Sequence, residues 1–174
     1  MLWRLAHNIG NIPHSNYNTR EQIAACTDPI GFDGIYYNVY ENRDVLKDKT
    51  GILFVMGDYV GKDNSFDLHN VPQLEKYCTW SEIAEIVHDL PHFSIGWHTW
   101  SHPDLTTLSF DEIMREVTPP FEMDTFAYPY GRYNQLVVDC VKRAGYKQAY
   151  SVTQGTKDPN DPDANFKIFR DYIR

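Results

Sequence analysis

The sequence predicts an α/β fold in which helices cover a parallel sheet. Short apolar runs rich in β-branched and aromatic residues alternate with segments of helical periodicity, and the connections between them are short. The 174 residues suit one domain, which we expect to span residues 1–174. In β/α folds of this kind, functional side chains lie at the carboxyl ends of the strands.

The strands are expected at the apolar runs. These runs cover residues 30–33, 52–56, 93–97, 125–128, 147–152 and 166–173. Residues 154–165 are rich in Gly, Pro, Asp and Asn, so we expect a surface loop there, one that could also line a groove.

The helices are expected from their start and stop signals. Residues 79–82 and 109–112 have the Ser/Thr-x-x-Glu pattern of a capping box, and apolar residues at helical spacing follow each of them. Asn134 can cap a later helix, which Gly145 would end in the left-handed conformation. An earlier helix is expected near residues 38–46.

Charge and hydropathy exclude several classes of function. Acidic residues outnumber basic ones by 24 to 16, which gives a net charge of −8 and disfavours a nucleic-acid partner. No apolar run approaches the roughly 20 residues that a membrane span needs. Arg4 and His7 interrupt the first residues, so we expect no signal peptide and a cytoplasmic protein. The three widely spaced cysteines are expected to be reduced thiols.

Candidate metal ligands follow two of the expected strands. His98 and His102 lie four residues apart, a spacing at which two imidazoles can bind one metal, although two structural histidines are the alternative. Asp33 is a candidate ligand, and Gly34 after it lets the backbone approach a ligand closely. The alternative role of Asp33 is to cap the next helix. Together, Asp33, His98 and His102 form a set of two histidines and one carboxylate.

A third polar cluster lies at residues 126–134. Pro129 and Gly131 indicate a tight turn there, which can present backbone N–H groups to an oxyanion. A plain strand-to-helix turn is the alternative, and both interpretations are compatible.

Three segments resemble known motifs. Residues 98–105, 126–134 and 143–152 are similar, in order and spacing, to the second, third and fourth motifs of the polysaccharide deacetylase family, the NodB-like carbohydrate esterases of family 4. The similarity runs from about residue 30 to 151. It implies a distorted, incomplete (β/α) barrel that hydrolyses N-acetyl, or in some members O-acetyl, groups of sugars.

The resemblance also implies roles for individual residues. It assigns a divalent metal, most simply zinc, to Asp33, His98 and His102, and a catalytic role to Asp33 and Tyr130, the latter through nearby backbone N–H groups that hold the oxyanion. The residues expected to contact an N-acetylated saccharide substrate are Tyr128, Pro129, Tyr130, Gly131 and Trp100.

The chain departs from the family pattern at three places. The first motif of the family ends in two adjacent aspartates, a base and then a ligand, whereas here Phe32 occupies the place of the base and Asp33 that of the ligand, counting back from Gly34. Ala127 replaces the arginine of the third motif, and no histidine follows His102.

These departures leave other residues to be considered as substitutes. His7 and His14 could replace the missing histidine, although exposed or core-packed rings are expected for them. Further polar residues near expected strand ends or loops are Asp58, Asp104 and Arg170.

The sequence leaves three functions open. The first is a metal-dependent deacetylase, expected to act in surface-polysaccharide biosynthesis. The second is a degenerate deacetylase fold that binds an amino sugar or a partner without turnover, which the missing Asp and His favour. A non-haem iron oxygenase with the same ligand set is the third, and the order of the motifs disfavours it.

Overall fold

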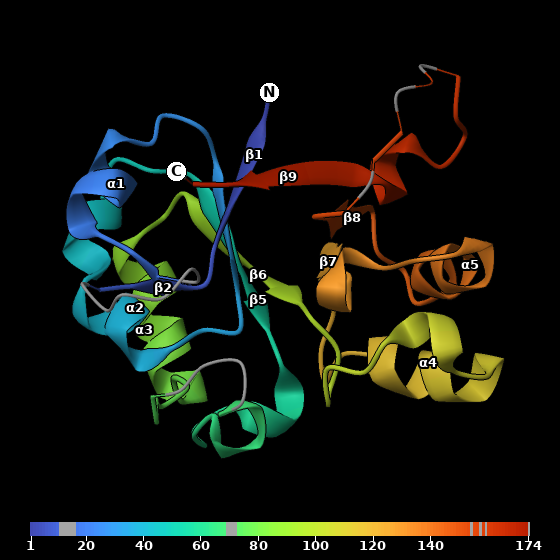
Figure 1. The fold of residues 1–174 in the computed structure, drawn as a ribbon, viewed down its shortest axis with the longest axis horizontal. Helices are drawn as coiled ribbons and strands as arrows, with labels where there is room; N and C mark the ends of the chain where they lie inside the picture. Colours follow the sequence, from blue (N-terminus) through green and yellow to red (C-terminus); the bar gives the residue numbers. More distant parts are fainter. Residues whose placement is uncertain (11–16, 69–72, 154, 157, 159, 174) are drawn as a thin grey trace.

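The computed structural model describes residues 1–10, 17–68, 73–153, 155–156, 158 and 160–173. Within these residues, seven parallel strands form a closed barrel, and the last strand pairs with the first (Figure 1). In barrel order, the strands are β1 (Trp3–Ala6), β4 (Ile30–Asp33), β5 (Gly51–Val55), β6 (Phe93–Trp97), β7 (Thr125–Ala127), β8 (Gln148–Ser151) and β9 (Ile168–Tyr172). Two short strands, β2 (Asn8–Ile9) and β3 (Tyr17–Asn18), pair separately.

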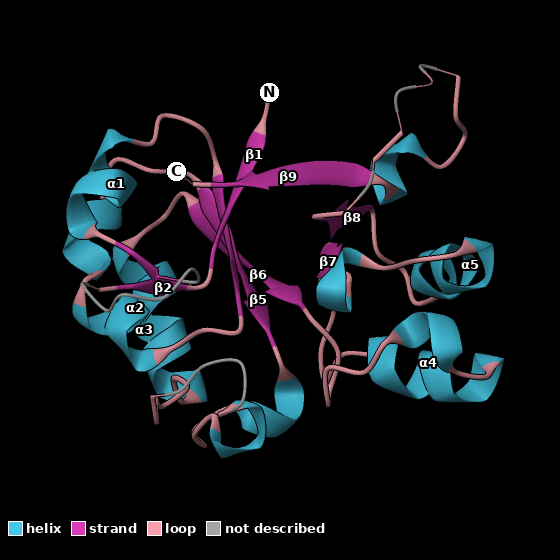
Figure 2. Ribbon diagram, viewed as in Figure 1, coloured by secondary structure: helices cyan, strands magenta, loops and turns pink. Residues whose placement is uncertain are grey.

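Helices cover the barrel from two sides. The helices α1, α2 and α3 lie together on one side, and α4 and α5 lie on the other (Figures 1 and 2). Their bounds are Arg20–Ala25 for α1, Tyr37–Glu41 for α2, Trp80–Asp89 for α3, Phe110–Val117 for α4 and Gln135–Arg143 for α5. In the part of the chain that the structure describes, no helix has the length and apolar character needed to cross a bilayer.

The expected helix signals are confirmed. Thr79 and Ser109 each form a capping box with the glutamate three residues later, at the starts of α3 and α4. Asn134 accepts a hydrogen bond from the N–H of Val137 at the start of α5, and Gly145 takes φ +98° just after its end. A short 3-10 helix follows α2 and completes the helical segment expected near residues 38–46.

The first strand and the first helix were not predicted. Arg4 interrupts the apolar pattern of β1, but its charge is balanced by Asp28 at 2.9 Å and Asp171 at 3.4 Å, so the strand is tolerated. The capping box of α1, made by Thr19 and Gln22, has a glutamine in place of the glutamate seen in the other two.

The barrel is distorted between β6 and β7. These strands share the single register pair Trp97 and Phe126, whereas β5 and β6 are paired over five residues. Seven strands are one fewer than in an eight-stranded (β/α) barrel. The distorted barrel that the sequence predicts is therefore confirmed.

The alternation of side chains along the strands gives an outer and an inner apolar core, and a third, smaller cluster contains Tyr36, Met56 and Tyr77. A large outer core fills the space between barrel and helices, while Ile52, Phe54, Ala127 and Tyr150 form a small inner core. The interior is crowded: a Cβ atom placed on Gly96 would lie 2.7 Å from the Phe54 ring.

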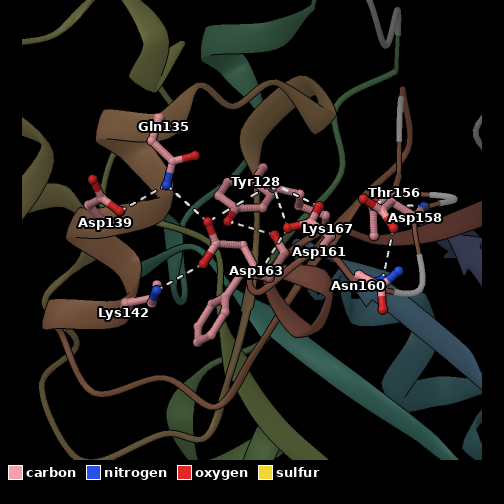
Figure 3. Close-up of polar contacts among 11 residues, drawn as sticks. Tyr128, Gln135, Asp139, Lys142, Thr156, Asp158, Asn160, Asp161, Asp163 and Lys167 are labelled. Carbon is pink, nitrogen blue, oxygen red and sulfur yellow. Dashed lines mark hydrogen bonds and ion pairs between the residues drawn. The ribbon is translucent and has the colours of Figure 1, made fainter.

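The segment between β8 and β9 is fastened to α5 by charged groups (Figure 3). Asp163, which is 6% exposed, accepts hydrogen bonds from Lys142 Nζ at 2.8 Å and from Gln135 Nε2 at 3.0 Å. Lys167 Nζ contacts Asp161 at 3.0 Å in the same network. The lysines balance the acidic side chains, so this cluster holds the end of the expected surface loop in place.

Candidate functional site

An ion pair lies inside the barrel, at the carboxyl end of β4. Arg170, on β9, donates from Nη1 to Asp33 Oδ1 at 2.6 Å and from Nη2 to Oδ2 at 2.7 Å. Asp33 is 8% exposed and Arg170 is fully buried. Burial alone would raise the pKa of Asp33, but Arg170 and His98 outweigh it and hold the pKa well below its ordinary value. Asp33 is therefore a carboxylate at neutral pH.

His98 lies directly after β6, next to this carboxylate. Its Nε2 is 3.8 Å from Asp33 Oδ2, and its Nδ1 is 2.8 Å from the carbonyl oxygen of Ala127. A carbonyl only accepts hydrogen bonds, so Nδ1 carries the proton and Nε2 keeps its lone pair. Burial lowers the pKa of His98, which keeps the ring neutral at pH 7.

His102 completes the histidine pair. The centroids of the His98 and His102 rings are 4.8 Å apart, so the sequence spacing does bring the two imidazoles together. Burial, with a contribution from His98, lowers the pKa of His102 to about 3. Both rings are thus in the neutral form that binds metals.

The loop that carries the two histidines is strained. Thr99 and His102 have φ values of 71° and 60°, in the left-handed region that residues other than glycine rarely adopt. The hydroxyl of Thr99 accepts a hydrogen bond from the N–H of His102 at 3.0 Å. Such strain persists where surrounding contacts impose it, commonly at functional sites.

Glu116, in the last turn of α4, is the main contact that imposes this loop conformation. Its carboxylate accepts hydrogen bonds from the N–H groups of Trp100 and Ser101, both at 2.9 Å, and from the Ser101 hydroxyl at 2.7 Å. Sequence reasoning missed Glu116, because its helical position suggests an ordinary solvated side chain.

Replacing Glu116 by alanine is expected to lower the acetate release that the family resemblance implies by about tenfold or more, without unfolding the barrel. The variant removes three hydrogen bonds that hold His102 in place, and small misplacements of this kind reduce catalysis strongly. The measurement is kcat for that acetate release, beside Asp111→Ala, an exposed acidic position in the first turn of the same helix. A variant with wild-type kcat would show that the loop keeps its shape without Glu116.

The turn after β7 faces the histidine pair. Tyr130 has φ +57° and is 51% exposed, and its ring lies 4.7 Å from that of His102. Gly131, at φ +67°, is packed so closely that an added Cβ would lie 2.7 Å from the backbone nitrogen of Val152. Pro129 is buried in the same turn.

The other residues expected to contact substrate lie farther inside the protein. Tyr128 is 1% exposed, and its hydroxyl donates to the carbonyl of Phe166 at 2.9 Å, so its side chain is part of the outer core. Trp100 is partly buried against Trp97, and its Nε1 donates to the carbonyl of Thr118 at 2.9 Å.

The structure brings His7 to the site, although the sequence favoured an exposed or core-packed ring. His7 follows β1, the neighbour of β4 in the barrel, and its Nδ1 is 3.4 Å from the carbonyl oxygen of Asp33. Its ring centroid lies 6.2 Å from that of Tyr172, at the end of β9. The sequence did not predict β1, and this strand is what places His7 at the same end of the barrel as His98.

The remaining sequence candidates have other positions. Asp104 pairs with Arg132 at 2.7 Å and caps a 3-10 turn, which is a structural role. Asp58 lies in the turn after β5, where its N–H donates to the carbonyl of Trp100 at 3.0 Å. His14 lies outside the described residues.

The donor set for a metal ion is only partly assembled. The neutral, adjacent histidines suit a divalent cation, and the bond from His98 to Ala127 orients one of them. Both oxygens of Asp33, however, accept hydrogen bonds from Arg170. Among the described residues, no group of three or more His, Cys, Asp or Glu side chains is arranged to hold a metal. The role of Asp33 as a ligand stays a prediction.

Comparison with known families agrees with the geometry. Residues 32–149, well over half of the chain, match the family model described as polysaccharide deacetylase. The chain belongs to the polysaccharide deacetylase family. The matched range contains Asp33, both site histidines and the Tyr130 turn, whereas His7 and Arg170 lie outside it. No curated protein matches the sequence.

Several solved structures share the fold of this family member. A polysaccharide deacetylase from Bacillus cereus is 18% identical, with a TM-score of 0.77 over 99% of this chain and 64% of its own. IcaB from Ammonifex degensii is 16% identical, with a TM-score of 0.76 over 99% of this chain and 91% of its own. The Streptococcus pyogenes deacetylase PplD, solved in complex with acetate, is 17% identical, with a TM-score of 0.75 over 100% and 91%. This chain thus spans less than two thirds of the Bacillus cereus protein.

Proposed function

We propose that this protein hydrolyses acetyl groups from an N-acetylated sugar or saccharide, in surface-polysaccharide biosynthesis. The observation that carries the proposal is the convergence of His98, His102, Asp33 and His7 at one end of the barrel, beside the exposed ring of Tyr130. Membership of the polysaccharide deacetylase family supports the same reaction class.

The reaction adds the oxygen of water to the acetyl carbon and breaks the bond from that carbon to the sugar nitrogen. Acetate leaves, and the nitrogen takes up a proton to become a free amine. Asp33 is ionised and can accept a hydrogen bond from the attacking water. The turn at Tyr130 can offer backbone N–H groups to the oxyanion that forms on the acetyl oxygen.

His7 is the group proposed to protonate the leaving nitrogen. His7 follows β1, which neighbours β4 on one side, whereas the histidine pair follows β6, which lies on the other side of β4 in the barrel order. An imidazole has the ordinary pKa nearest to neutrality, which suits a proton donor.

The proposal includes a divalent metal, because the family resemblance implies one, and zinc is the metal that we expect. Its place would be the pair His98 and His102, where it could polarise the acetyl carbonyl.

Replacing His7 by glutamine is expected to lower kcat on an N-acetylated saccharide about 100-fold, the usual effect of removing a general acid. The same variant should lose far less activity on an aryl acetate, whose leaving group needs no proton. The comparison of the two substrates is the measurement. Equal losses on both would assign His7 a structural role instead.

The proposed function is tested by acetate release from a panel of N-acetylated and O-acetylated saccharides. The protein is assayed after chelation and after addition of Zn²⁺ or Co²⁺, and acetate is quantified enzymatically. Release from at least one N-acetylated saccharide supports the proposal.

The second candidate is a protein that binds an acetylated saccharide without turnover. The ion pair between Asp33 and Arg170 favours it, because a carboxylate whose pKa is held so low is a weak base. Saturable saccharide binding without acetate release across the panel would support this candidate and exclude the first.

A further inference from the structure

The ion pair between Arg170 and Asp33 occupies the position from which a carboxylate would reach the histidine pair. The carboxylate oxygen nearer to His98 is Oδ2, at 3.8 Å from Nε2, and this oxygen also accepts a hydrogen bond from Arg170 Nη2 at 2.7 Å. The other oxygen, Oδ1, is bound to Nη1 at 2.6 Å. A bidentate pair of this kind is among the strongest charge-assisted contacts.

The barrel is built around the guanidinium. Gly31, two residues before Asp33 on β4, has no side chain, and a Cβ atom there would lie 2.8 Å from Arg170 Nη1. The guanidinium carbon lies 5.0 Å from the Phe54 ring centroid and 5.9 Å from that of Tyr150. The side chain of Arg170 therefore has a defined position in the inner core.

The guanidinium is oriented toward Asp33. Its Nε is buried and has no hydrogen-bond partner among the described residues, while both terminal nitrogens donate to the carboxylate. Because the pair is shielded from water, a cation that approached Asp33 would be repelled by Arg170 with little screening.

We infer that Arg170 withholds Asp33 from metal coordination, so that any divalent cation at this site is held by His98 and His102 without a carboxylate ligand. The inference takes only the location of the site from the proposed function. Arg170 thereby sets the affinity of the site for cations. Without its positive charge, Asp33 would complete a set of two histidines and one carboxylate.

The test is the affinity of the purified, chelator-treated protein for Co²⁺ and Zn²⁺, measured by isothermal titration calorimetry. Three variants are compared with the wild type: Arg170→Met, the double variant Asp33→Asn with Arg170→Met, and Arg170→Lys. The lysine variant keeps the buried charge balanced, so it serves if the methionine variant does not fold, and its single ammonium cannot hold both carboxylate oxygens.

The inference expects a gain in affinity of at least tenfold in Arg170→Met, a smaller gain in Arg170→Lys, and wild-type affinity in the double variant. Affinity that is unchanged or lower in both single variants would overturn it. A double variant that binds at least tenfold more weakly than the wild type would also overturn it, because Asp33 would then be a ligand in the native protein. These affinities do not depend on deacetylation, so they still test the role of Arg170 if the proposed function is wrong.

Discussion

Replacing His98 by alanine is expected to lower acetate release about a thousandfold, within the range seen when a group that acts on the reacting atoms is removed. The imidazole is the side chain that links the parts of the site. It contacts Asp33 through Nε2 and Ala127 through Nδ1, and it packs against the ring of His102. The variant loses all three contacts.

The measurement is kcat/KM for acetate release, with circular dichroism to show that the barrel is folded. His88→Ala is the matched control, because this histidine is exposed in the last turn of α3, before the amino end of β6, whereas His98 follows the carboxyl end of that strand. The control should retain wild-type activity. A His98→Ala variant that is folded and releases acetate at more than a tenth of the wild-type rate would contradict the proposed site.

Replacing Arg170 by methionine is expected to reduce the free energy of unfolding of the metal-free protein by about 3–5 kcal/mol, because breaking a buried ion pair leaves an uncompensated charge. Arg170 is fully buried, and Asp33 has no other guanidinium or ammonium partner among the described ion pairs. Removing both charges, by adding Asp33→Asn, should recover part of the loss.

The variant should also reverse the pH dependence of stability. In the wild type, the folded pKa of Asp33 lies below its unfolded value of about 3.9, so its contribution is present above pH 4 and is lost as the pH falls. Without Arg170, burial, which is the largest influence on this carboxyl, is expected to raise the folded pKa above the unfolded value, against the lowering effects of His98 and His7. The contribution is then present below pH 4 and is lost as the pH rises through the new folded pKa.

Chemical denaturation of the metal-free proteins between pH 3 and 7 measures both effects. The double variant is the control for the pH dependence, because it lacks the titrating carboxylate. An Arg170→Met variant whose stability follows the wild-type pH curve would show that Asp33 is not governed by Arg170.

Most of the barrel could be predicted from local patterns. The bounds expected for β4 and β6 agree with the structure, because both strands are short runs of mainly apolar residues and polar residues follow them. Capping boxes located α3 and α4 in the same way. The strand β1 was missed because Arg4 breaks its apolar pattern, and only partners distant in the sequence, Asp28 and Asp171, balance that charge.

The features of the candidate site also divide into those set by local sequence and those set by the tertiary structure. The sequence by itself determined the family resemblance, the pairing of His98 with His102 and the turn at Tyr130, because each depends on residues that are close together in the chain. The tertiary structure decided that Arg170 binds the carboxylate of Asp33 across a separation of 137 residues and that His7 lies beside the backbone carbonyl of the same residue. Closing the barrel pairs β9 with β1, which also pairs with β4. No local pattern records which charges will meet when strands from the two ends of a chain become neighbours.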